Sequence, residues 1–174
     1  MRRRDNIKEA GPTGSRPVEG GPLAIYEVAA GCPFVLCGGR SVPTFYFLMA
    51  GEVHIEKAGT VYPLVCRELF AVLPNRQLKG RAMSDTVIVG CSLNAEFGGL
   101  SCDQVGPALL ADAKPALFQT LAIHPLLFEE IWLYVRGRRD GKIPYGPYLH
   151  LKHEQVLLLL REIYSAESLA SLCR

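Results

Sequence analysis

Apolar and polar positions alternate in short runs between residues 22 and 103. About eight runs rich in Val, Ile, Phe, Tyr and Thr are separated by Gly, Pro, Asn or Asp. Runs of this kind at roughly ten-residue spacing predict the strands of a sandwich, a jelly roll or a small barrel. The predicted strands are LAIYEVAA, FVLC, TFYFLMA, EVHIEK, TVYPLVC, ELFAVL, LKGRAM and TVIVGCSL.

The period changes to that of a helix in the second half of the chain. Residues 115–123 and 125–135 carry apolar side chains at helical spacing, and each segment begins with a proline, a residue favoured in the first turn of a helix. Leu127, Ile131 and Val135 fall on one face of the second segment and are expected to be buried. The fold class predicted is therefore mainly β with C-terminal helices.

A further helix is predicted over residues 152–164, KHEQVLLLLREIY. Leu158 and Leu159 widen its apolar stripe beyond one buried face, so we expect the helix to meet a second copy of the chain. Ser165 is the predicted N-cap of a last short helix, AESLASL. The residues of the stripe, which are the candidate dimerisation residues, are Val156, Leu157, Leu160, Ile163 and Tyr164.

The N-terminal residues 1–21 are rich in Gly and Arg and cannot bury a core, so they predict a flexible tail. No apolar stretch follows this basic tail, and no run of about 20 apolar residues occurs elsewhere. We therefore expect a cytoplasmic protein with no membrane partner. The net charge of the 174 residues is +2, which is too small to indicate that they bind nucleic acid themselves.

One histidine lies between two carboxylates in the predicted strand EVHIEK. Glu52, His54 and Glu56 share a face, with neighbours about 7 Å apart and the outer pair about 13 Å apart. Metal–ligand bonds are only about 2.0–2.2 Å long, so the three side chains cannot bind one ion. We expect His54 to have a surface or cross-strand role.

The six cysteines form no CxxC pair and are interpreted as structural thiols.

Two longer segments carry a resemblance to a known family. FYFLMAGEVHIEKAGTVYPLVCRELFAVLPNRQ resembles the cupin barrel of AraC-family transcription regulators. LKHEQVLLLLREIYSAESLASL resembles their connector helices, in which a Leu-Leu-Arg-x-x-Tyr pattern precedes a short helix capped by serine. The resemblance covers about residues 24–172, and it implies a cupin-like jelly-roll barrel followed by a helical dimerisation segment.

The resemblance implies four parts in the chain. These are a tail (1–21), a cupin-like barrel (22–109), a helical dimerisation segment (110–164) and the start of a connector (165–174). In such regulators the barrel binds a small effector, such as a sugar or another metabolite, and the helices form a homodimer. DNA is bound by a helix-turn-helix region, which we expect to lie outside these 174 residues.

Metal-binding cupins carry a His-x-His pair and a glutamate before the glycine that matches Gly51. In this chain the glutamate position falls on Thr44, and the histidine positions fall within residues 37–40, which contain no histidine. We therefore expect no cofactor and a binding module rather than an enzyme. The candidate effector-binding residues on the barrel strands are Arg40, Thr44, Tyr46, Gln77 and Lys79.

Two alternatives stay open. The first is a free-standing cupin enzyme, an isomerase or a dioxygenase, which needs a metal or a general base inside the barrel. The second is an interaction or storage protein that uses the barrel only as a scaffold.

Overall fold

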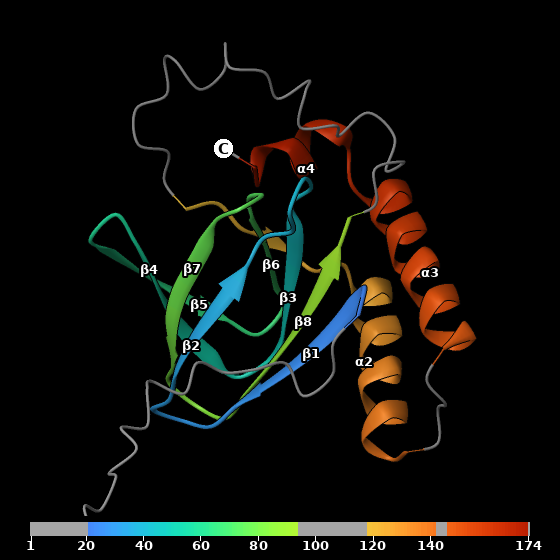
Figure 1. Cartoon of the computed structure of the whole chain (residues 1–174), viewed down its shortest axis with the longest axis horizontal. Coiled ribbons are helices and arrows are strands. Elements are labelled where there is room, and N and C mark those ends of the chain that lie inside the picture. The colour runs from blue at the N-terminus through green and yellow to red at the C-terminus, as the bar shows by residue number, and fades with distance from the viewer. Residues whose placement is uncertain (1–20, 94–117, 142–145, 174) are drawn as a thin grey trace, which may run out of the picture.

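The computed structural model describes residues 21–93, 118–141 and 146–173 (Figure 1). The predicted tail (apart from residue 21), Cys102 and the beginning of the expected helix at 115–123 lie outside the described residues. All eight predicted strands are present. They are β1 (Leu23–Val28), β2 (Pro33–Cys37), β3 (Thr44–Ala50), β4 (Glu52–Lys57), β5 (Thr60–Val65), β6 (Glu68–Val72), β7 (Gln77–Ala82) and β8 (Thr86–Ser92).

The strands form two antiparallel sheets with nested pairing. The first sheet has the order β1-β8-β3-β6-β9, and the second has the order β2-β7-β4-β5. The pairs β1–β8, β2–β7, β3–β6 and β4–β5 are nested: β1–β8 joins the two ends of the barrel sequence, and β4–β5 is the hairpin at its centre. This is the pairing of a long hairpin folded over on itself, which is the jelly roll. The predicted fold class is confirmed.

The first sheet is buried on both of its faces, as β3 illustrates. Tyr46 and Leu48 lie in the barrel interior between the two sheets. Phe45, Phe47 and Met49 point to the other side and pack against the helices. Alternate residues of a strand point to opposite faces, so a strand that is apolar throughout, such as TFYFLMA, requires a cover on each side.

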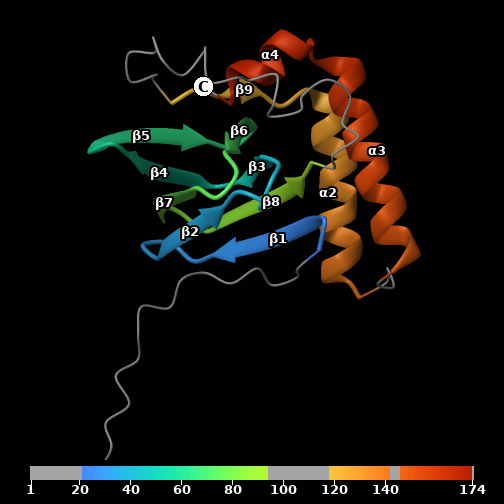
Figure 2. The ribbon, with the colours of Figure 1, turned by 45° about the horizontal axis from the view of Figure 1, so that its top comes forward.

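The helices provide the outer cover. They are α2 (Pro125–Arg139), α3 (Pro147–Ile163) and α4 (Ala166–Ser171). Figures 1 and 2 show α2 and α3 side by side along one flank of the barrel. The helices run antiparallel, because Tyr164 after the end of α3 bonds His124 before the start of α2. The predicted N-cap is confirmed, since the Ser165 hydroxyl accepts a hydrogen bond from the Ser168 N–H.

The helix expected over residues 115–123 is wrong for the described residues 118–123. Leu121–Ala122 forms β9 instead and pairs with β6, where Leu121 lies opposite Leu69. Pairing with the edge of a sheet thus overrides the local helical spacing. The segment lies in the sheet that carries the helices and leads directly into α2.

Buried polar contacts tie the helices to the sheet and to each other. The Tyr134 hydroxyl of α2 donates to the Leu23 carbonyl of β1 at 3.1 Å. Lys152 of α3 is only 6% exposed and donates to Glu130 of α2 at 2.5 Å. An unpaired buried ammonium would be costly, so this ion pair fixes how α3 sits against α2.

No helix among the described residues is long and apolar enough to cross a membrane.

The turn between β4 and β5 has an unusual residue. Lys57 and Thr60 are paired, and the two residues between them, Ala58 and Gly59, both have positive φ (51° and 77°). This is the two-residue hairpin in which Asn-Gly is favoured. Gly59 adopts positive φ without a steric penalty, while Ala58 adopts a conformation that is unfavourable for a residue with a Cβ atom.

Replacing Ala58 with glycine is therefore expected to raise the free energy of unfolding by about 0.5–1 kcal/mol, because glycine has no Cβ penalty at positive φ. Denaturant unfolding followed by circular dichroism measures the change. Gly59→Ala is the matched control and is expected to lower stability by about 1 kcal/mol. A loss of stability in Ala58→Gly would contradict the described turn.

Candidate functional site

A pocket of about 150 Å³ opens at the end of the barrel where β2 ends and β3 begins. We call it the mouth pocket. It is bordered by the inner face of β1, β3 and β8 and by the glycines that follow β2. The lining residues used below are Tyr26, Gly38, Thr44, Tyr46, Gly90 and Ser92.

Tyr46 forms the floor of the mouth pocket and is held from several sides. Its hydroxyl donates to the Cys37 carbonyl at 2.7 Å and accepts from the Cys37 N–H at 3.2 Å. Its ring stacks on Phe70 and meets the edge of Tyr26, with centroids 5.7 and 6.0 Å away. These contacts make Tyr46 a rigid part of the pocket.

The two tyrosines of the pocket stay uncharged. Burial raises the pKa of the Tyr46 hydroxyl well above its ordinary value, and the nearby Tyr26 raises it further. Burial also raises the pKa of Tyr26. Neither phenol ionises near neutral pH, so both remain neutral groups that can donate a hydrogen bond.

Glycines create the space for these rings. A Cβ atom on Gly90 would lie 2.8 Å from Cε1 of Tyr46, so no larger residue fits there without moving the ring. A Cβ atom on Gly38 would lie 1.8 Å from the Leu73 carbonyl oxygen. Asn75, at φ 55°, donates its side-chain amide to the Arg40 carbonyl and so holds the loop beside the pocket.

The hydroxyl of Thr44 is the most informative group in the mouth pocket. Thr44 is only 6% exposed, yet no hydrogen bond joins its hydroxyl to another residue in the described ranges. Buried hydroxyls are normally hydrogen-bonded, and each exception requires an explanation, such as an ordered water, an ion or a ligand. Ser92 lies directly opposite Thr44 in the β3–β8 ladder and adds a second hydroxyl. None of the described lining residues carries a charge.

The five residues predicted to bind an effector do not lie together. Thr44 and Tyr46 line the mouth pocket. Arg40 is exposed in the loop beside it, where its carbonyl accepts from Asn75. Gln77 and Lys79 are exposed and point away from the barrel interior, because the buried residues of β7 alternate with them.

Sequence reasoning missed Tyr26, Gly90 and Ser92. Gly90 interrupts the apolar strand TVIVGCS, and a glycine inside a strand often marks a close approach of another group. The pairing of β8 with both β1 and β3 is what brings the three residues together, and this pairing joins distant parts of the chain.

A larger depression, of about 360 Å³, lies on the second sheet. Its walls are outward-pointing side chains that include Val61, Lys79 and Arg81. One of them is already engaged, since Arg81 donates to the Gly31 carbonyl at 2.7 Å. Several of the side chains that line it, such as Val61 and Lys79, are exposed. We take the smaller mouth pocket as the candidate site because it holds the buried Thr44 hydroxyl, which has no hydrogen-bond partner among the described residues.

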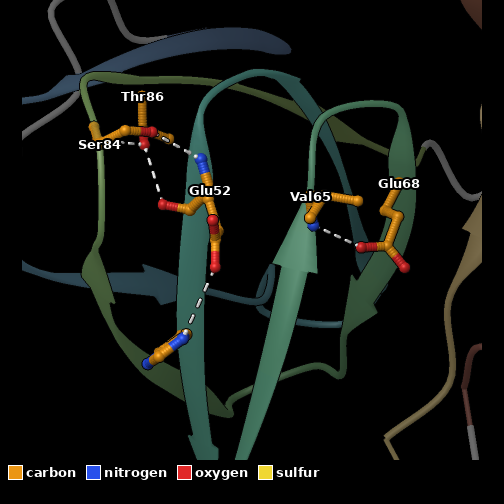
Figure 3. Close-up of polar contacts among 6 residues, drawn as sticks. Glu52, Val65, Glu68, Ser84 and Thr86 are labelled. Carbon is orange, nitrogen blue, oxygen red and sulfur yellow. Dashed lines mark hydrogen bonds and ion pairs between the residues drawn. The ribbon is translucent and has the colours of Figure 1, made fainter.

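The predicted surface role of His54 agrees with its position on β4. His54 points outward with Glu52 and Glu56, and its Nε2 lies 3.9 Å from the Glu52 carboxylate. Figure 3 shows the end of this strand, where the Glu52 N–H donates to the Ser84 hydroxyl at 2.9 Å. Within residues 21–93, 118–141 and 146–173, no three His, Cys, Asp or Glu side chains are grouped to hold a metal ion.

The five predicted dimerisation residues are engaged inside the chain to different degrees. Val156, Leu157 and Leu160 are buried in the core beneath α3. Ile163 and Tyr164 are partly buried against the same core. The Tyr164 hydroxyl accepts from the His124 N–H and donates to the Ala122 carbonyl, both at 2.8 Å. The stripe therefore attaches α3 to its own barrel, and dimerisation itself stays a prediction.

No protein-family model matches the sequence, and no curated protein matches it. The solved structures to which the chain is similar include cupin and double-stranded β-helix domains. A double-stranded β-helix protein from Klebsiella pneumoniae has a TM-score of 0.39 at 10% identity, over 46% of this chain and 76% of that one.

Two other structures have comparable values. An RmlC-like cupin from Shewanella frigidimarina has a TM-score of 0.34 at 16% identity, over 39% of this chain and 60% of that one, which is less than two thirds of its length. The cupin domain of an XRE-family transcriptional regulator from Enterobacter cloacae has a TM-score of 0.34 at 11% identity, over 42% and 84%.

The variant Tyr46→Phe is expected to lower the free energy of unfolding by about 1 kcal/mol, because it removes both hydrogen bonds to Cys37 while keeping the ring. Urea unfolding measures the loss. Tyr62→Phe is the control, since Tyr62 makes a ring contact with Phe118 and no hydrogen bond joins its hydroxyl to a described residue. Equal effects of the two substitutions would show that the Tyr46 hydroxyl does not hold the pocket.

Proposed function

We propose that the chain is the ligand-sensing and dimerisation part of an AraC-like transcription regulator that acts in the cytoplasm. A small effector binds in the mouth pocket, and the helices carry the signal to a helix-turn-helix region outside these residues. In this proposal the chain is not an enzyme. The observation that carries it is the buried Thr44 hydroxyl, which lacks a described partner in a pocket on the helix-bearing sheet.

The chemistry of the pocket favours a small, uncharged ligand with hydroxyl groups. A charged ligand would lose its hydration in a pocket whose described lining residues include no counter-charge. Thr44 and Ser92 present hydroxyls that both donate and accept. The ring of Tyr26 offers an apolar surface beside them. A sugar fragment or another small hydroxylated metabolite has this combination of groups.

The position of the pocket supports a relay to the helices. β3 and β8 border the pocket with their inner residues, and their outer residues pack under α2 and α3. A ligand that shifts these strands changes the surface on which the helices rest. A ligand can favour one of two helix packings only if it binds that packing more tightly.

The proposal divides the chain into three parts after the tail. These are the barrel (22–109), the helical dimerisation segment (110–164) and the start of the connector (165–174).

The surface for a second copy is proposed on the outward face of the helix pair. Leu151 and Leu158 of α3 are 69% and 57% exposed and lie seven residues apart. Leu126 and Leu133 of α2 are also exposed and have the same spacing. Leucines at seven-residue intervals form the seam of packed helices. A twofold axis through this face would bury all four leucines against the same four of a second copy.

The effector proposal predicts that a neutral hydroxylated compound raises the melting temperature of the protein. A panel of pentoses, hexoses and their polyols, tested by thermal shift and then by calorimetry, measures binding. Thr44→Val and Ser92→Ala are each expected to weaken the best compound about five- to tenfold, because each removes a hydrogen bond.

Gln77→Ala and Lys79→Ala serve as controls, since both residues point away from the barrel interior. They are expected to leave the affinity unchanged. Binding that is lost in Lys79→Ala and kept in Thr44→Val would assign the ligand to the outer depression instead. Stoichiometric iron, manganese or zinc in the purified protein would favour the alternative of a cupin enzyme.

The dimer proposal predicts that Leu151→Glu combined with Leu158→Glu converts a dimer into a monomer at micromolar concentration. Charges at these positions would be buried without partners in the interface. Sedimentation velocity measures the change. Val61→Glu on β5 is the control, because Val61 has the same 57% exposure as Leu158 but lies on the second sheet. A wild-type protein that sediments as a monomer would contradict the proposal.

A further inference from the structure

One residue of the mouth pocket makes a direct contact with the helices. The side chain of Ser92 lines the pocket, while its carbonyl oxygen lies 2.7 Å from Nε2 of His153 on α3. A carbonyl can only accept, so Nε2 of His153 carries the proton and donates it. His153 is 5% exposed, so water does not compete freely for this bond.

Ser92 is placed where a strand can move. It is the last residue of β8 and pairs with Thr44, the first residue of β3. Beyond that pair, the Ser92 N–H donates to the Pro22 carbonyl at 3.0 Å, and the next bond, from Leu93 to Pro43, is long at 3.4 Å. The end of a ladder is less constrained than its centre. A ligand between Thr44 and Ser92 therefore acts at the end of the β3–β8 ladder.

His153 lies at the point where the two helices are joined. Its neighbour Lys152 makes the buried ion pair with Glu130 of α2, and Gln155 bonds the same carboxylate at 3.1 Å. Nδ1 of His153 lies 3.7 Å from the carboxylate of Glu154. Lys152 and His153 are consecutive residues of α3, so a change in the position of His153 also changes the position of the Lys152–Glu130 ion pair.

Another hydrogen bond also crosses from a helix to this sheet, but it does not reach the pocket. Tyr134 of α2 donates to the Leu23 carbonyl. The side chain of Leu23 packs in the core under the helices, on the opposite face of the sheet from the pocket. The Ser92–His153 bond, in contrast, joins a residue of the pocket lining to a helix.

We propose that the hydrogen bond from His153 to Ser92 couples the mouth pocket to the α2–α3 pair. His153 acts as a positioning residue: filling the pocket displaces Ser92, weakens or reorients this bond and loosens α3 around His153. The inference rests on the proposed sensing function, since it names the regulation of the same pocket.

The test fills the pocket without an effector. Ser92→Cys is made in a protein in which Cys32, Cys37, Cys66 and Cys102 are replaced by serine. The new thiol is treated with methyl methanethiosulfonate, which attaches an S-methyl group through a disulfide and releases methanesulfinate. The contact with His153 is made by the backbone carbonyl of residue 92, so the substitution itself leaves its acceptor in place. Hydrogen exchange of the α3 amides is compared before and after labelling.

Labelling is expected to speed exchange of the amides around His153 by about threefold or more, as expected for a local loosening. In His153→Gln, labelling is expected to change the exchange rates by much less, because the substitution has already altered the hydrogen bond to the residue 92 carbonyl. His150→Gln is the matched control on the same helix, since His150 is exposed, and its response to labelling should match that of the parent. Equal responses in all three proteins, or no response in the parent, would overturn the proposal.

A second measurement applies if His153→Gln does not fold. The ring nitrogen and proton signals of His153 are followed by NMR in the labelled Ser92→Cys protein, with His54 and His150 as internal references. A shift confined to His153 supports the coupling, and an unchanged His153 signal overturns it. The label fills the pocket without an effector, so this test does not depend on finding a compound that binds. If labelling changes α3 but no compound binds, the sensing proposal alone is refuted. If a compound binds in the pocket but labelling leaves α3 unchanged, this inference alone is refuted.

Discussion

The structure depends on one sheet that is buried on both faces. The sheet β1-β8-β3-β6-β9 encloses the barrel interior with one set of side chains and supports the helices with the other. In β3, neither Phe47 nor Leu48 is exposed, although they point in opposite directions. Removing either cover would expose large apolar area, at about 25 cal/mol per Å². Barrel and helices therefore form one folded unit.

In the proposed sensing function, this double burial is the means by which a site at the end of the sheet would influence the helices. Much of the barrel interior is filled by apolar side chains such as Phe34, Leu36 and Phe70, and the mouth pocket opens beside the glycines that follow β2. There, the inner residues of β3 and β8 border the pocket while the outer residues of the same strands pack under α2 and α3. A packed interior transmits small shifts, because its side chains have few alternative arrangements. In this proposal the same sheet, β1-β8-β3-β6-β9, would border the effector pocket on one face and support the dimerisation helices on the other.

The strands were predictable because apolar runs and the turn residues between them are local signals. The helix expected near Leu121 was wrong because the pairing with Leu69 joins residues that lie far apart in the sequence. Thr44 and Tyr46 were identified as polar groups on a barrel strand, whereas Gln77 and Lys79 looked equally suitable because sequence alone does not orient their strand. Ser92 and His153 meet only through tertiary packing, so no spacing rule could have connected them.

The central claim is that a small neutral molecule occupies the mouth pocket. A titration with hydroxylated compounds, followed by NMR of the Thr44 methyl and the Tyr26 and Tyr46 ring signals, tests it most directly. The account predicts saturable shifts of these signals while the Val61 methyl signals, on the outer face of the second sheet, stay unchanged. Shifts at Val61 without shifts at Thr44, or no saturable shift with any compound, would contradict it.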